Sequence, residues 1–285
     1  ASGGNYNTVV GDEAGTAIST GDYNTGVGYK SLDTTNTGAR NTAIGAFSLD
    51  DNTTGSSNTA IGMSTIQNNI SGSYNTAVGD QSLDANLASN NTAVGYFAMQ
   101  ANTTGASNTA VGQSSLDSNI DGTQNVVIGA EAMKTATSDD GAVVVGYLAG
   151  RDMNGATHTT LLGSYAGHKI TTGDKNTYVG TESGPQGAAS SGFSNVGLGY
   201  VALAANTTGA YNVALGAQAL NDNTSGQSNT AVGWNALSKA TTVNANTAVG
   251  ESALRSATSG ATNTAVGQAA MGNAVVTGVA SKSGI

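Results

Sequence analysis

A Val, Ile or Leu followed directly by Gly recurs at a regular spacing in sixteen successive units of the chain, and thirteen of the fifteen steps between these glycines have the same length, as from Gly28 to Gly45. One of the other two steps is a residue shorter, from Gly79 to Gly95, and the last is two longer, from Gly180 to Gly199. A fixed period of this length is typical of stacked units that bury their apolar faces only against their neighbours. We therefore expect a single repeat domain over residues 1–285.

The composition favours an ordered repeat over a conventional globular core. Charged residues make up 9% of the chain, against about 25% in ordinary domains, while Gly reaches 41 residues and Pro stops at one. The net charge of -9 disfavours nucleic acid and anionic lipid as partners. The absence of Cys excludes disulfides and thiolate chemistry. No segment is apolar enough to predict membrane insertion.

The residues before each of these glycines alternate in the manner of a short strand. In Thr42-Ala43-Ile44, as in the other units, the first and third positions are almost all β-branched and the middle one is mostly Ala. Because strand side chains alternate between faces, the first and third columns share a face. We expect that face to line the coil interior, and the uncharged Ala face to be covered by another copy of the chain.

Two further columns complete the unit. An Asn opens the strand in fourteen of sixteen units, which predicts a ladder of stacked carboxamides. A second apolar residue, such as Leu32, lies four residues after the Gly and predicts a second short segment. In variant units this residue is Gly and the apolar residue comes three places later, as in Gly150 with Met153 and Gly167 with Ile170.

The motif N-T-A-[VI]-G, with A-L four residues later, resembles the repeats of trimeric autotransporter adhesin heads and of trimeric bacteriophage tail fibres and bacterial surface fibres. The resemblance covers residues 5–272. It implies a left-handed parallel β-roll of about 16 coils, three chains around one axis, on the surface of a virion or bacterial cell. Since the chain holds no segment that resembles the anchor, stalk or chaperone of such proteins, we expect a mature or excised shaft, a rod of roughly 75 Å at the strand spacing of about 4.7 Å.

Motifs for enzyme chemistry are missing from the sequence, so we expect no catalytic activity, no cofactor and no metal site. His158 and His168 lie ten residues apart, but no third metal ligand accompanies them. Asp recurs one place after the Leu anchor, and we expect this column to face solvent. Asn-x-Thr triplets beginning at Asn52 and Asn102 resemble glycosylation acceptors, but the repeat itself produces them.

The coils of residues 130–194 depart from the pattern of the regular coils at 5–129 and 195–272. Residues 130–190 hold ten of the 27 charged residues, both histidines and the one proline. A local departure from a repeat often marks a functional surface, although sequence drift gives the same pattern. The candidate receptor-binding residues have side chains that stack on or hydrogen-bond to a glycan or protein. They are Tyr147, Arg151, His158, Tyr165 and His168.

Three functions remain open at this stage. The first is the structural shaft or head of a trimeric attachment fibre that binds a cell-surface receptor or glycan. The second is an ice-binding or other ligand-binding β-solenoid, which the repeated Thr suggests; an inward-pointing strand Thr argues against it. The third, a glycan-cleaving spike, needs paired acids in a groove between chains.

Overall fold

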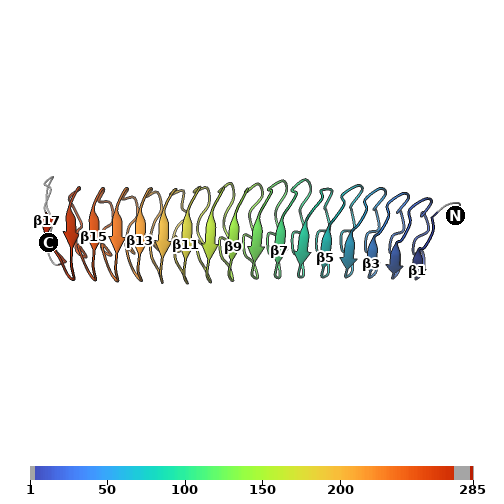
Figure 1. The fold of residues 1–285 in the computed structure, drawn as a ribbon, viewed down its shortest axis with the longest axis horizontal. Coiled ribbons are helices and arrows are strands. Elements are labelled where there is room, and N and C mark those ends of the chain that lie inside the picture. Colours follow the sequence, from blue (N-terminus) through green and yellow to red (C-terminus); the bar gives the residue numbers. More distant parts are fainter. Residues whose placement is uncertain (1–3, 273–282, 285) are drawn as a thin grey trace. The chain divides into compact units, whose positions relative to one another are not determined.

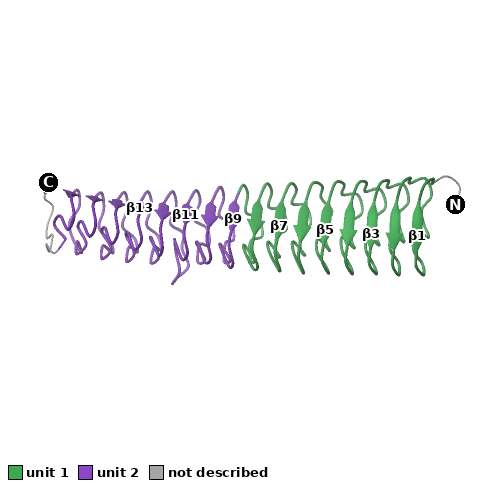
Figure 2. Ribbon diagram, turned by 60° about the horizontal axis from the view of Figure 1, so that its bottom comes forward, with its two compact units in different colours: residues 1–141 green, residues 142–285 purple. Residues whose placement is uncertain are grey.

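The computed structural model describes residues 4–272 and the backbone of residues 283–284. The chain forms two compact units, residues 1–141 and 142–285 (Figure 2). Each unit is a stack of coils that contribute one short strand apiece. None of the described residues forms a helix of the length and hydrophobicity needed to cross a membrane. The predicted all-β parallel solenoid of about 16 turns, with its 17-residue repeat, is confirmed.

Sixteen strands of three residues each end at the residue before the repeated Gly, and a two-residue strand follows them (Figure 1). The first unit contains β1 (Thr8–Val10), β2 (Thr25–Val27), β3 (Thr42–Ile44), β4 (Thr59–Ile61), β5 (Thr76–Val78), β6 (Thr92–Val94), β7 (Thr109–Val111) and β8 (Val126–Ile128). The second contains β9 (Val143–Val145), β10 (Thr160–Leu162), β11 (Thr177–Val179), β12 (Val196–Leu198), β13 (Val213–Leu215), β14 (Thr230–Val232), β15 (Thr247–Val249), β16 (Thr264–Val266) and β17 (Ser283–Gly284).

The repeat period sets the register of the sheet. Within each unit, consecutive strands pair in parallel, and each residue faces the residue one period away, as Thr42 faces Thr59 and Ala43 faces Ala60. The shorter and the longer step keep this register, because β5 pairs with β6 and β11 with β12 at equivalent positions. The extra or missing residues are therefore absorbed in the turns.

The segment after each strand is a chain of bends rather than a second strand. Gly28 has a φ of 136°, and a Cβ at this position would lie 2.5 Å from the carbonyl oxygen of Gly45 in the next coil. Lys30 and Leu32 then adopt left-handed backbone with φ of 54° and 58°. Such conformations are costly for residues with side chains. Hydrogen bonds to both neighbouring coils hold them here, since the Lys30 N–H donates to Asp12 and the Leu32 N–H to Ser48.

The strand alternates as predicted, but the expected assignment of its faces is wrong. Ala43 is fully buried inside the coil, whereas Ile44 is 41% exposed and Thr42 is half-buried on the outer face. The reason is the narrow coil: a Cβ added at Gly26, in the middle column of β2, would lie 3.1 Å from Leu32 Cδ1. The inward middle position is mostly Ala or Gly, although Val127 is also fully buried there opposite Met133, and the residues on either side of it point outward. The Ala column is covered by its own coil and not by another copy of the chain.

In most coils the interior is filled by the Leu, Ile or Met four residues after the strand-closing Gly, and we call these the leucine coils. Those of the first unit are all fully buried: Leu32, Leu49, Ile66, Leu83, Met99, Leu116 and Met133. The second apolar anchor of the sequence pattern is thus the main hydrophobic contribution to the coil.

In the glycine coils the anchor position is Gly, at residues 15, 150, 167 and 184, and other side chains fill the space. A Cβ at Gly150 would lie 2.7 Å from Met153 Sδ and 2.8 Å from Leu161 Cδ1. Met153 and Leu161 are fully buried, which confirms that the apolar anchor shifts by three residues. After Gly184 the corresponding residue is Gly187, and the fully buried ring of Tyr178 takes the space instead.

Two columns of buried Asn run along the stacks. In the strand-opening column, the Asn41 N–H donates to Asn24 Oδ1 at 2.9 Å, and Asn41 Nδ2 donates to the Gly55 carbonyl at 2.8 Å. In the second unit, side chains of this column also bond to one another directly: Asn212 Nδ2 donates to Asn195 Oδ1 at 3.2 Å. Because these groups are buried, each hydrogen bond also removes a desolvation penalty.

Candidate functional site

Three aromatic rings from the irregular coils meet on the surface that follows β9 and β10. The Tyr147 and Tyr165 rings are edge-to-face, with centroids 5.5 Å apart, and the Tyr165 and His168 rings are edge-to-face at 5.4 Å. Tyr147 is 50% exposed, while Tyr165 and His168 are half-buried. Burial and the adjacent Lys169 ammonium lower the pKa of His168. The cluster is therefore an aromatic platform that is uncharged at neutral pH.

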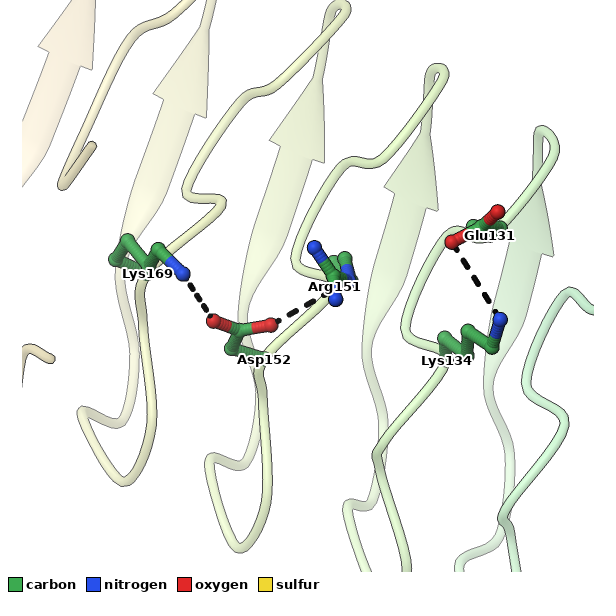
Figure 3. Close-up of polar contacts among 5 residues, drawn as sticks. All are labelled: Glu131, Lys134, Arg151, Asp152 and Lys169. Atoms are coloured by element: carbon green, nitrogen blue, oxygen red, sulfur yellow. Dashed lines mark hydrogen bonds and ion pairs between the residues drawn. The ribbon is translucent and has the colours of Figure 1, made fainter. Parts of the chain in front are cut away.

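Charged side chains lie along the same coils. Lys169 Nζ is 2.7 Å from one oxygen of Asp152, and Arg151 Nε is 3.7 Å from the other (Figure 3). Both cations thus contact the carboxylate of Asp152, and the charge of Glu182 acts on the nearby Tyr165. One coil earlier in the sequence, Lys134 and Glu131 form a simple pair at 3.5 Å.

The structure brings four of the five predicted receptor-binding residues onto the segment after the strand. Tyr147, Arg151, Tyr165 and His168 all follow the strand of their coil, whereas His158 is exposed at the bend that precedes β10. His158 makes no ring contact with the aromatic platform in the described part of the chain. Over that same part, no three His, Cys, Asp or Glu side chains are grouped closely enough to hold a metal ion.

The Asp column after the anchor is half-buried rather than fully solvent-facing. Burial raises the pKa of Asp84 and Asp117, and burial together with the charges of Asp51 and Asp33 raises the pKa of Asp50. A raised carboxyl pKa means that the folded state opposes ionisation at these sites.

The Asn residues of the apparent glycosylation triplets are interior residues. Asn52 and Asn102 are fully buried or nearly so, and their amide groups donate to the carbonyls of Gly55 and Gly105. They also belong to a second ladder, in which Asn119 Nδ2 donates to Asn102 Oδ1 at 2.7 Å. A glycan on either Asn would require removal of its side chain from the core.

A further surface, which sequence reasoning placed inside the coil, is the outer face of the strands. We call the first and third strand positions of β1–β8 and of β9–β16 the outer strand face of each unit. None of these positions is charged. The third position is exposed or half-buried throughout, for example Ile61 at 38% and Val94 at 37%. Exposed apolar surface of this continuity is typical of an interaction site.

Asp152 and Lys169 were also missed, although the sequence carries a signal for their contact. They lie one repeat period apart, the spacing that puts residues of neighbouring coils side by side. Comparing charges one period apart identifies this pair, and likewise Asp222 with Lys239 at 2.8 Å.

Comparison with known proteins adds no family assignment: no protein-family model matches the chain, and a search of curated proteins finds no match. The fibre repeats of the sequence resemblance therefore enter only through the motif itself.

Proposed function

We propose that this chain is the shaft or head of a homotrimeric attachment fibre, extracellular on a virion or bacterial surface, which binds a cell-surface receptor or glycan. The observation that carries the proposal is the outer strand face. It presents one exposed or half-buried aliphatic residue per coil and no charge, so a single chain in water leaves a long apolar stripe exposed. A second copy of the chain, with the same repeat and the same height per coil, matches such a stripe coil by coil.

The charges are distributed in agreement with this arrangement. Every charged residue of the sixteen coils lies outside the three-residue strands. The outer strand face becomes the interface between chains, and the bends that follow the strands remain for solvent and receptor. Left-handed coiling and the number three come from the motif resemblance, and they are part of the proposal. The proposal assigns no catalytic chemistry.

The experiment compares the two faces of neighbouring strands in the first unit. Changing Ile61, Val94 and Val111 to Glu puts charge on the outer strand face. We expect this variant to keep its circular dichroism spectrum and to fall to monomer mass in light scattering, because buried unpaired charge opposes association.

The matched control places the same charges on the inner face, at Ala77, Ala93 and Ala110. These residues are fully buried in the coil, so we expect the chain to lose its fold rather than only its oligomeric state. A native chain that is already a monomer contradicts the trimeric fibre, as does an outer-face variant of unchanged mass.

Ice binding is a second candidate, and one observation favours it. The sequence argument against it assumed that the strand Thr points inward, whereas residues such as Thr42 and Thr59 are on the outer strand face, in register from coil to coil. A repeated Thr and aliphatic array is the surface such a function needs. Thermal hysteresis from the native chain, together with monomer mass, supports this candidate; an oligomer without thermal hysteresis supports the fibre.

A further inference from the structure

Tyr200 and Trp234 hold the same place in their coils, one residue after the strand-closing Gly, and lie two coils apart. Both side chains are exposed, at 53% and 50%. Over the described residues, neither ring contacts another aromatic ring, whereas the exposed ring of Tyr211 in the same unit packs edge-to-face against Phe193. The second unit thus presents two separate exposed rings in one row.

The stacked backbone fixes how far apart the two rings are attached. Between them lies Ala217, the equivalent residue of the coil that follows β13. The Gln218 N–H donates to the Tyr200 carbonyl at 2.9 Å, and the Asn235 N–H donates to the Ala217 carbonyl at 3.1 Å, so the three coils are stacked in order at this bend. Two strand spacings amount to about 9.5 Å. Since the residue between them ends in a methyl group, no large side chain of the row separates the two rings.

The side chains next to the pair favour a neutral, hydroxyl-rich ligand. The residues that follow the row in these three coils are Val201, Gln218 and Asn235, and none of them is charged. Gln218 is half-buried, and its amide makes no side-chain hydrogen bond among the described residues, so it is able to donate to and accept from hydroxyls. Glu251 continues the row one coil after Trp234 and is exposed. Its negative charge disfavours an anionic ligand.

We propose that the row of Tyr200, Ala217 and Trp234 binds an extended, neutral, β-1,4-linked glycan that runs along the stack. The faces of sugar rings carry C–H groups that pack on aromatic rings, and their edges carry hydroxyls. In such a glycan, alternate sugars turn the same face to the same side, and their separation is close to two strand spacings of the solenoid.

Alternate sugars therefore stack on Tyr200 and Trp234. The sugar between them lies over Ala217, where its hydroxyls bond to the Gln218 amide. Because the coils hold both rings at a fixed spacing before the ligand arrives, little order is lost on binding. This inference rests on the proposed attachment function and specifies its ligand class.

The experiment uses the fluorescence of Trp234, which is the single Trp of the chain and reports on this site alone. The full chain is titrated with two β-1,4-linked probes, cellohexaose and N-acetylchitohexaose. The controls are maltohexaose, which has the sugars of cellohexaose in a curved α-linked chain, and cellobiose, which is too short to reach both rings. We expect at least one β-linked hexasaccharide to change the Trp234 emission and to bind about tenfold or more tightly than the controls. Binding of neither hexasaccharide, or equal binding of maltohexaose, overturns the proposal.

Three variants test the rings and their spacing by calorimetry. Tyr200→Ala and Trp234→Ala each remove one ring and are expected to weaken hexasaccharide binding by about tenfold. The double variant Ala217→Trp with Trp234→Ala keeps two rings but puts them one coil apart, and we expect it to bind no better than Trp234→Ala. Tyr211→Ala is the matched control, because Tyr211 is exposed in the same unit but lies outside the row.

The changed side chains are exposed or half-buried, so all four variants should keep the circular dichroism spectrum of the native chain. Equal loss of binding in Tyr211→Ala, or full binding by the spacing variant, overturns the assignment.

Light scattering and acrylamide quenching on the same samples separate this site from the proposed function. An oligomer that binds neither hexasaccharide leaves the fibre intact and removes the glycan site. A monomer that binds one of them removes the fibre and keeps the glycan site. An oligomer in which acrylamide does not reach Trp234 has a second copy of the chain over the rings, and this result also overturns the glycan site.

Discussion

The leucine coils and the glycine coils build the same cross-section from different residues. In a leucine coil, a small strand residue such as Ala110 lies opposite a large anchor such as Leu116, and both are fully buried. In the glycine coils near β11 the sizes are exchanged: Tyr178 occupies the strand position, and Gly184 and Gly197 leave room for its ring. The coil therefore conserves interior volume rather than residue identity, as close packing requires.

The exchange also involves a polar position. This position lies seven residues after the strand-closing Gly. Most leucine coils have a buried Asn of the second ladder there, such as Asn102. The glycine coils that follow β9 and β10 have Met153 and Ile170 at the same position. The ladder must stop where Asn is replaced. Among the described residues, its last member before Ala136 keeps an unpaired oxygen, Asn119 Oδ1. The end of the ladder thus has a local cost in hydrogen bonding, here between two leucine coils, because Ala136 shares its coil with the anchor Met133.

The largest expected effect tests the volume exchange. Tyr178→Ala empties the ring site and should lower the free energy of unfolding by about 3–5 kcal/mol. Gly184→Leu should also destabilise, because its side chain overlaps the Tyr178 ring. The double variant recreates the leucine-coil pairing, so we expect it to lose less than the sum of the two single changes. Urea unfolding of all four proteins measures this, and strictly additive losses would contradict the exchange.

A smaller effect tests the ladder that only the leucine coils contain. Asn102→Ala removes hydrogen bonds to both Asn86 and Asn119, which are buried. We expect a loss of about 1–3 kcal/mol in the free energy of unfolding. Asn68→Ala is the control, because Asn68 is exposed and its change should cost less than about 0.5 kcal/mol. Equal losses in the two variants would show that the ladder adds no stability.

The smallest effect concerns the half-buried Asp column of the leucine coils. Burial raises the pKa of Asp117 in the folded chain, and Lys134 only partly opposes the shift. The stabilising contribution of protonated Asp117 is complete below its unfolded pKa and is lost as pH rises through the folded value. Asp117→Asn should therefore raise the melting temperature at pH 7, by up to about 3 °C, and give no advantage near pH 3. Thermal scans at both pH values check this, and a variant less stable than its parent at pH 7 contradicts it.

Part of the candidate site could be predicted from the repeat period of the sequence alone. Asp152 and Lys169 lie one period apart, so the repeat pairs them directly, whereas Tyr147 and Tyr165 lie in consecutive coils one residue off that spacing, which places them only in the same neighbourhood. His158 was grouped with them only because it lies in the irregular part of the sequence. Position within the coil, rather than proximity in sequence, separates it from the platform.

The sequence by itself determined the coil number, the strand positions and the register, because a residue faces its equivalent one period away. It also determined that Thr42 and Ile44 share a face and that Ala43 lies on the other. It did not determine which face is inside, since a period of two residues is unchanged when the two faces are exchanged. Only the tertiary structure decided this: the middle column faces the buried anchor, where space is short and Ala fits in most coils, so the column of Thr42 and Ile44 is the outward one.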